Sequence, residues 1–180
     1  MMDDMETDVF LKNVLADDGL YALLAIRSSD DRRVQKFYPT IGHLIEGAVA
    51  FDSKGYDSYF GLATYDKDGS RKADNVKELK SFFLDLDCGP SKDYANQGDA
   101  IVALRRFCKE LQLPKPLTVN SGRGVHVYWG LTESVGKENW LQVSRVLKAK
   151  CTQHNLLADV AVTADVCRVL RIPKTHNHKT

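Results

Sequence analysis

Two carboxylates that could share a metal ion stand in an otherwise apolar part of the chain. Asp85 and Asp87 lie two residues apart within residues 81–88, half of which are aromatic or aliphatic. In a β-strand, residues two apart point to the same face, so both carboxylates would project together beside Phe83. Neighbouring carboxylates repel one another at neutral pH unless a positive charge neutralises them. The pattern predicts a site for Mg²⁺ or Mn²⁺, which prefer oxygen ligands; the alternative is a solvent-facing strand with two ordinary acids.

A glycine-containing turn with polar neighbours follows some thirty residues later. Its members are Ser121, Gly122, Arg123, Gly124 and His126. Glycine lets the backbone approach a ligand closely, and the exposed N–H groups of a tight turn favour anions. Together, the serine, the arginine and the histidine could grip a phosphate by charge-assisted hydrogen bonds. A plain hairpin turn and a structural histidine explain the parts separately, whereas the combination indicates a phosphate-binding turn.

A third polar group interrupts an apolar stretch near the C-terminus. Asp159 opens it, Asp165 follows, and Arg168 and Arg171 stand three residues apart behind them. An aspartate in such a stretch could supply a third metal carboxylate. Both arginines could reach phosphate oxygens. The alternative is a strand or turn held by salt bridges.

Strands and helices must position these groups. Helices are predicted over residues 8–15, from Pro39-Thr40 onward, from a cap at Asp99 to about residue 111, and from about residue 137 to 154. Strands are predicted over residues 21–26, 56–65, 82–88, 117–120 and 125–131. The last two strands form a hairpin with the glycines at its tip. Because this hairpin interrupts the alternation, the sequence predicts an α+β fold with a mixed or antiparallel sheet.

Composition narrows the classes of protein to consider. The chain has 180 residues, 43% of them hydrophobic, enough for one large domain or two small lobes with a proper core. We expect no membrane span, because no apolar run approaches 18 residues, and no secretory signal, because the N-terminus is acidic. The four cysteines include no CxxC pair, which argues against a zinc ribbon and for buried thiols in a reducing compartment.

The C-terminal part of the chain is basic. Residues 136–180 carry eight basic side chains against three acidic ones, whereas residues 1–35 carry eight acids against four bases. A basic C-terminal third could meet phosphates, although a solvated helix face accounts for the lysines before residue 151. Near the end, His176 and His178 resemble a metal-binding His-x-His pair. Because apolar residues do not flank them, a polar surface loop or a nucleotide contact is the favoured interpretation.

In this order, the three motifs resemble those of the catalytic domain of the archaeo-eukaryotic primase superfamily, in particular the primase-polymerases of phages and plasmids. That family has an Asp-x-Asp/Glu strand motif, a motif often written sGxGxH, and an apolar-Asp motif followed by arginines. The matching residues here are Asp85 and Asp87; Ser121, Gly122, Gly124 and His126; and Asp159 with Arg168 and Arg171. Asp165 is the second candidate for the third aspartate. A Pro-Gly-Thr-x-Asn-x-Lys segment often follows in the family, and here Lys174 replaces its glycine.

The resemblance implies an activity, its cofactors and a set of partners. It implies a two-lobed fold with an RRM-like sheet that bears the metal site, with a smaller lobe over about residues 1–75 and a motif-bearing part over about 76–180. It implies template-directed nucleotidyl transfer that makes or extends primers on single-stranded DNA from NTPs or dNTPs, with two ions of Mg²⁺ or Mn²⁺ and no zinc. The metal ligands would be Asp85, Asp87 and Asp159, and the nucleotide-binding residues would be Ser121, Gly122, Arg123, Gly124, His126, Arg168, Arg171 and Lys174, with Lys179 as a further phosphate contact.

The family also sets expectations about the rest of the protein. The chain would be the N-terminal domain of a longer protein, working with a helicase in the same chain or a separate one. It would act in the cytoplasm, of a bacterial host cell if a phage or plasmid encodes it. Three alternatives remain at this point: a metal-dependent DxD glycosyltransferase, a nuclease or His-x-His replication initiator, and a non-catalytic module that binds single strands. The initiator would need a tyrosine nucleophile, and no tyrosine follows Tyr128.

Overall fold

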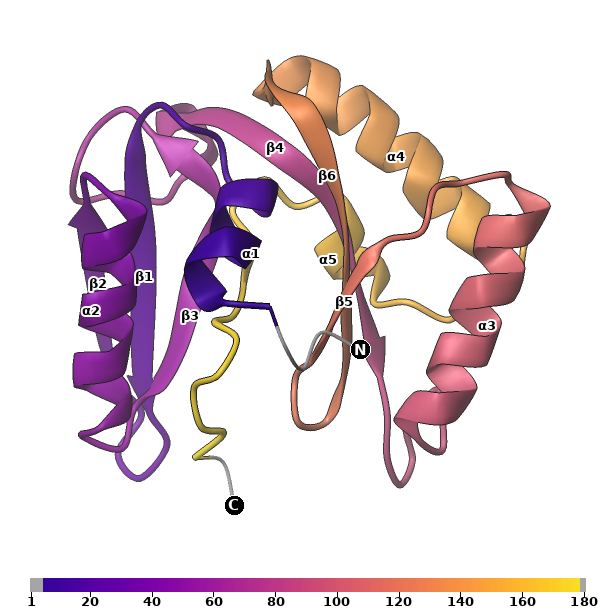
Figure 1. The fold of residues 1–180 in the computed structure, drawn as a ribbon, viewed down its shortest axis with the longest axis horizontal. Coiled ribbons are helices and arrows are strands. Elements are labelled where there is room, and N and C mark those ends of the chain that lie inside the picture. Colours follow the sequence, from indigo (N-terminus) through magenta and orange to yellow (C-terminus); the bar gives the residue numbers. More distant parts are fainter. Residues whose placement is uncertain (1–4, 179–180) are drawn as a thin grey trace.

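A seven-stranded sheet organises residues 5–178, the part of the chain that the computed structural model describes. Its strands run in the order β2-β1-β3-β4-β6-β5, with β7 paired to β3 beside this path, and every strand pair is antiparallel (Figure 1). The strands are β1 (Leu20–Arg27), β2 (Arg32–Tyr38), β3 (Asp57–Tyr65), β4 (Val76–Asp87), β5 (Leu117–Asn120), β6 (Gly124–Gly136) and β7 (Val169–Arg171). The helices are α1 (Thr7–Val14), α2 (Ile41–Asp52), the 3₁₀ turn η1 (Ala73–Asn75), α3 (Gln97–Glu110), α4 (Lys137–Gln153) and α5 (Val160–Thr163). The α+β class and the antiparallel sheet predicted from the sequence are confirmed.

The sheet forks between β3 and β4. These two strands pair only at one end, where Ala63 lies opposite Leu79 and Tyr65 opposite Val76. Toward its other end β3 pairs with β7 instead, while β4 continues beside β6 as far as Asp87. In Figure 1 the strands β1–β3 with α2 form one half of the molecule and β4–β6 with α3 and α4 form the other, with the C-terminal segment between them. The fork opens a space beside the C-terminal end of β4.

Strand β4 packs against an apolar cluster on each face. Leu84 and Leu86 are fully buried in a cluster formed with α3, α4 and β6. Phe83 is fully buried on the opposite face, in the larger cluster that contains residues of α1, α2 and β3. Burying such side chains contributes roughly 1.5–3 kcal/mol each. The strand is therefore fixed by packing on both sides of the point where its aspartates begin.

Helix α1 covers one face of the central strands but leaves their ends open. The ring of Phe10 packs edge-on against that of Tyr128 on β6, with their centroids 5.0 Å apart, and Tyr128 is fully buried. Two residues further along the same face of β4 from Phe83, the side chain of Asp85 remains 22% exposed. The hydrophobic core thus ends where the carboxylates begin, which keeps charge out of the apolar interior.

Several elements differ from the sequence-based prediction. The predicted cap of α3 at Asp99 is wrong, because the side chain of Asn96 accepts a hydrogen bond from the backbone N–H of Asp99 and starts the helix at Gln97. Strand β2 and the short helix α5 were not predicted. Residues of β2 are largely exposed, so its sequence lacks the apolar alternation on which strand prediction relies.

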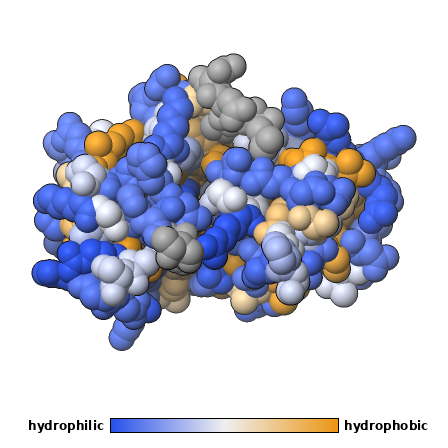
Figure 2. Space-filling view, turned by 90° about the horizontal axis from the view of Figure 1, so that it is seen from below, coloured by the Kyte–Doolittle hydropathy of each residue, from blue (hydrophilic) through white to orange (hydrophobic). Residues whose placement is uncertain are grey.

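The described part of the chain has a polar face and unpaired cysteines. Among the described residues, no helix has both the length and the apolar character needed to cross a lipid bilayer. Figure 2 shows the molecule from below, relative to the view of Figure 1. This face is mostly hydrophilic, with apolar residues in small separate patches. All four cysteines are free thiols, of which Cys88 and Cys151 are buried and the other two partly buried.

Candidate active site

The three motifs meet in one hollow at the fork of the sheet. The hollow has a volume of about 370 Å³. Its lining includes Asp85 from the first motif, Ser121, Arg123 and His126 from the second, and Asp159, Arg168 and Arg171 from the third. Motifs at least 33 positions apart along the chain are therefore brought together by the pairing of β4 with β6 and by the return of the chain through α5 and β7. Tyr59 and Asn177, which the sequence did not single out as site residues, line the same hollow.

Asp85 and Asp159 are joined through their backbones. The N–H of Asp159 donates to the carbonyl oxygen of Asp85 at 2.9 Å, which places the start of α5 against the end of β4. The side chain of Asp159 caps α5 by accepting a hydrogen bond from the N–H of Ala161 at 2.9 Å. Burial, followed by the charges of Asp87 and Asp159, raises the pKa of Asp85 from 3.8 to about 6. Asp85 therefore carries negative charge that its surroundings do not neutralise.

The other two candidate carboxylates occupy different surroundings. Asp87 does not line the hollow, but its charge reaches Asp85, and its carboxylate forms an ion pair with Lys92 at 2.8 Å. Asp165 does not line the hollow either. It accepts a hydrogen bond from the N–H of Cys167 at 2.9 Å and lies 3.5 Å from the guanidinium of Arg168. The structure thus places Asp159, rather than Asp165, beside Asp85.

His126 is a buried neutral imidazole in the floor of the hollow. It lies directly opposite Asp85 in the β4–β6 pairing, and its Nε2 is 3.9 Å from the nearer carboxylate oxygen. Burial, followed by the positive charge of Arg171, lowers the pKa of His126 to about 3. Its Nδ1 lies 3.4 Å from the hydroxyl of Tyr128, whose pKa is raised well above 10 by burial. The phenol stays protonated and can donate to Nδ1; in that tautomer the ring proton is on Nε2, the nitrogen on the side of Asp85.

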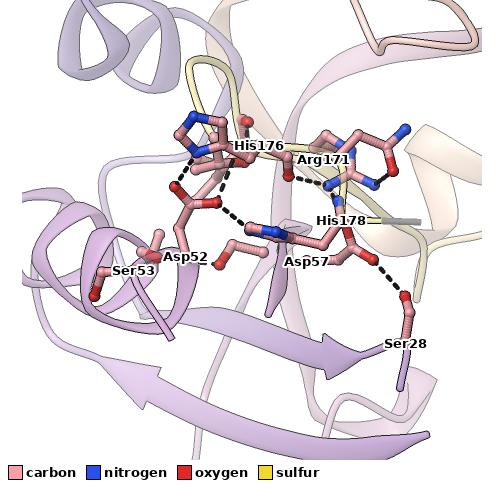
Figure 3. A network of polar contacts seen from close by, with 12 residues as sticks. Ser28, Asp52, Ser53, Asp57, Arg171, His176 and His178 are labelled. Atoms are coloured by element: carbon pink, nitrogen blue, oxygen red, sulfur yellow. Dashed lines mark hydrogen bonds and ion pairs between the residues drawn. The ribbon is translucent and has the colours of Figure 1, made fainter. Parts of the chain in front are cut away.

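Arg171 joins the two sides of the hollow through a dense set of contacts. One terminal nitrogen lies 2.7 Å from the carboxylate of Asp57 and 2.8 Å from the carbonyl oxygen of His176. The other donates to the hydroxyl of Tyr59 at 3.2 Å and to the side-chain oxygen of Asn177 at 3.0 Å. Figure 3 shows this arginine between β3 and the C-terminal segment. The guanidinium was predicted to bind phosphate, and the structure shows it engaged with protein groups that it holds in place.

Asp57 is the functional neighbour that sequence reasoning missed. Its side chain is fully buried, and burial raises its pKa while the hydrogen bond from Arg171 lowers it, with a net lowering. The hydroxyl of Ser28 and the backbone N–H of His178 also donate to it, at 3.0 and 2.9 Å. An aspartate at the start of an apolar, aromatic strand was a signal, because a buried carboxylate requires a partner.

The two glycines of the turn allow close contacts, Gly124 with β4 and Gly122 with Asn177 of the C-terminal segment. A Cβ atom at Gly124 would lie 2.4 Å from the carbonyl oxygen of Leu86, so only glycine allows β4 and β6 to approach here. Gly122 has a φ of 89°, and a Cβ there would lie 3.2 Å from the amide nitrogen of Asn177. These glycines thus allow close backbone packing at the mouth of the hollow.

One predicted phosphate contact, Lys174, lies outside the hollow. Lys174 does not line the hollow; it lies in an adjacent depression, and its ammonium is 3.4 Å from the carboxylate of Glu6. Its φ of 63° is uncommon for a residue with a side chain, and Lys174 stands where the Pro-Gly-Thr-x-Asn-x-Lys motif has its glycine. Lys179 lies outside the described residues.

Solved structures of known proteins share this arrangement of strands and helices. The AEP domain of the primase-polymerase of cyanophage S-2L matches with a TM-score of 0.61 at 17% identity, over 86% of this chain and 72% of that chain. Primase RepB′ matches with a TM-score of 0.60 at 12% identity, over 96% of this chain and 49% of that chain. The chain has the fold of a primase-polymerase catalytic domain. It spans about half the length of the RepB′ chain.

A third structure with the same fold contains DNA. The polymerase domain of ligase D from Mycobacterium tuberculosis, in complex with DNA, matches with a TM-score of 0.56 at 12% identity, over 89% of this chain and 70% of that chain. No protein-family model and no curated protein sequence matches. The likeness is one of backbone fold, and it confirms the fold that the three motifs implied.

Proposed function

We propose that this chain transfers nucleotidyl groups on DNA, adding nucleotides to a 3′-hydroxyl opposite a single-stranded template. The observation that carries the proposal is the position of Asp85, a largely buried carboxylate beside Asp159 and opposite His126 in one hollow. The fold that this chain shares with primase and polymerase domains supports the same reaction.

The residues present suit a pair of divalent ions. The raised pKa of Asp85 means that Arg168 and Lys92, which lower it, do not offset burial and the two neighbouring carboxylates. A divalent cation would supply the missing positive charge, and oxygen-only ligands favour Mg²⁺ or Mn²⁺ over softer metals. Asp85, Asp87 and Asp159 would hold the ions. Ions bound there would lower the pKa of the attacking hydroxyl and stabilise charge on the leaving pyrophosphate.

The remaining residues of the hollow would bind and orient the nucleotide. The N–H at Nε2 of His126 would donate to a phosphate oxygen, and the neutral ring would do so throughout the physiological pH range. Ser121, Arg123 and Arg168 line the hollow and would donate to the other phosphate oxygens. Arg171 is a positioning residue, because it fixes Asn177 at the edge of the hollow rather than contacting phosphate.

The non-catalytic alternative explains the hollow less well. A module that binds single strands on its sheet would expose aromatic side chains for stacking on the face of the aspartates. Phe83 and Tyr128 occupy that face, but both are fully buried, Tyr128 against Phe10 of α1 and Phe83 against Trp140 of α4. Such a module would also leave the accumulation of carboxylates around Asp85 without a purpose. The DxD glycosyltransferase has no counterpart among the solved structures that share the fold.

A gel assay on single-stranded DNA tests the proposal. Labelled NTPs or dNTPs are supplied with Mg²⁺ or Mn²⁺, with and without an annealed primer. Products that depend on metal and template are expected from the wild type and not from the Asp85→Ala/Asp87→Ala double variant. Asp68→Ala, which changes an exposed acid in a turn, is the matched control and should retain activity. Products that persist in the double variant would refute the metal assignment, and products without primer would identify primer synthesis.

A further inference from the structure

A second group of possible metal ligands lies outside the hollow. It consists of Asp52, the last residue of α2, and of His176 and His178 in the segment after β7. The Nδ1 of His176 is 2.8 Å from one oxygen of Asp52, and the Nε2 of His178 is 3.1 Å from the other. Figure 3 shows both imidazoles directed at the same carboxylate.

The donor set differs from that of the hollow. Two imidazole nitrogens and a carboxylate oxygen suit Zn²⁺ and similar transition-metal ions, whereas Mg²⁺ and Mn²⁺ prefer oxygen alone. One ligand atom from each of the three residues lies within 4.8 Å of the others. Tetrahedral ligands of Zn²⁺ lie about 3.3–3.5 Å apart, as bond lengths of about 2.0–2.2 Å require, so small side-chain rotations would complete the set.

Hydrogen bonds hold the carboxylate of Asp52 in position before any ion binds. Asp52 is only 13% exposed, and it also accepts a hydrogen bond from the backbone N–H of His176 at 2.9 Å. The ring of His178 is 29% exposed and that of His176 is 79% exposed, so an ion can enter from solvent. A polar loop held by hydrogen bonds is the simpler interpretation, but it does not require two histidines on one carboxylate. Backbone N–H groups or a lysine would serve that purpose equally well.

We propose that Asp52, His176 and His178 bind one transition-metal ion of the Zn²⁺ type, with water in the fourth position. The ion would take the place of the hydrogen bonds that the two imidazoles now make with the carboxylate. Metal binding requires these nitrogens in their unprotonated form. This inference does not depend on the proposed function, because its ligands lie outside the hollow and its test does not use catalysis.

An ion at this position would also hold the segment that carries Asn177, a lining residue of the hollow. The carbonyl oxygen of His176 and the side chain of Asn177 both accept hydrogen bonds from Arg171, and the N–H of His178 donates to Asp57. An ion between α2 and this segment would therefore fasten the residues on either side of Asn177, which lines the hollow. The ion has a structural role: it links the end of α2 to the segment that closes one edge of the nucleotide site.

Metal titration of the purified chain tests the proposal. The protein carries Asp85→Asn and Asp87→Asn so that the catalytic carboxylates do not contribute, and it is freed of metal with EDTA. Zn²⁺ binding is measured by calorimetry and Co²⁺ binding by visible absorption, in the presence of excess Mg²⁺. The expected result is one ion per chain. His176→Asn and His178→Asn should each weaken binding at least tenfold.

The chain provides matched controls. His43, bonded to Thr40, and His154, paired with Glu110, are imidazoles outside the proposed site. His43→Asn and His154→Asn should leave the affinity unchanged. The absence of a bound ion at 100-fold excess of Zn²⁺ over protein would overturn the proposal, as would an affinity that is unchanged by His176→Asn. Because His176 is largely exposed, that variant should fold, and its outcome decides the question even if His178→Asn does not fold.

Discussion

Replacing Asp85 by asparagine should stabilise the metal-free protein while removing its activity. In the folded protein, burial and the neighbouring carboxylates raise the pKa of Asp85 from 3.8 to about 6. Each unit of pKa difference between the folded and unfolded states corresponds to about 1.4 kcal/mol of unfolding free energy. The folded protein therefore loses about 3 kcal/mol of stability when Asp85 ionises, and asparagine, which resembles the protonated acid in shape, avoids this loss.

The sign of the pH dependence follows from the direction of the pKa change. A carboxyl group whose pKa is higher in the folded state than in the unfolded state binds more protons when folded, so the folded state loses stability as pH rises. The penalty is absent below pH 3.8, develops between pH 3.8 and about 6, and is constant above that. The difference in unfolding free energy between Asp85→Asn and wild type should follow the same course.

Urea denaturation in EDTA at pH 4, 5, 6 and 7.5 measures this difference. Asp68→Asn, which alters an exposed acid in a turn, should change the unfolding free energy by no more than about 0.5 kcal/mol at any of these pH values. Added Mn²⁺ should stabilise the wild type and not Asp85→Asn, because a ligand stabilises only the state that binds it. Equal stabilities of wild type and Asp85→Asn at pH 7.5 without metal would refute the claim that uncompensated negative charge is stored at this residue.

Three further substitutions test the surroundings of the hollow. Asp57→Asn leaves a buried arginine without its ionic partner and should lower the unfolding free energy by about 3 kcal/mol in urea denaturation; a loss below 1 kcal/mol would contradict the ion pair's role. Gly124→Ala places a Cβ 2.4 Å from the carbonyl oxygen of Leu86 and should lower the unfolding free energy by about 1–3 kcal/mol. Its control is Gly136→Ala, whose Cβ would meet nothing within 4 Å and which should lower the unfolding free energy by less than about 0.5 kcal/mol in the same assay. Tyr128→Phe removes the hydroxyl 3.4 Å from His126 and should weaken nucleotide binding about fivefold by calorimetry, with the fold retained; unchanged binding would argue against the assigned ring proton.

The strand that carries the aspartates could be predicted because its information is local. The alternation over residues 82–87 shows directly which side chains share a face, and the structure places Leu84 and Leu86 in one cluster and Asp85 on the other face. The hairpin tip was recognisable from its glycines for the same reason. Short-range patterns of this kind follow from the two-residue period of a strand.

The fork of the sheet could not be predicted, because it depends on contacts between distant residues. Three residues of β7 pair with Tyr59, Phe60 and Gly61, more than a hundred positions earlier in the chain. A three-residue strand leaves no periodic pattern in the sequence. The ion pair of Arg171 with Asp57 could not be predicted for the same reason, since Asp57 comes from the start of β3.

The two C-terminal histidines show how one tertiary contact changes an interpretation. Taken alone, His176 and His178 favoured a polar surface loop or a nucleotide contact, because apolar residues do not flank them in the sequence. The third group, Asp52, lies at the end of a helix more than 120 residues earlier. Only the folding of the C-terminal segment against α2 brings these residues together.

The most direct test of the active-site assignment compares two neighbouring aspartates in a single-nucleotide extension assay. Asp159 lines the hollow beside Asp85. Asp165, six residues later, does not line it; it caps a turn and lies 3.5 Å from Arg168. With primed single-stranded DNA, one dNTP and Mn²⁺, Asp159→Asn should reduce the rate of incorporation at least a hundredfold, while Asp165→Asn should retain it within about fivefold. Full activity in Asp159→Asn, or loss of activity in Asp165→Asn alone, would contradict a nucleotidyl-transfer site at the fork of the sheet.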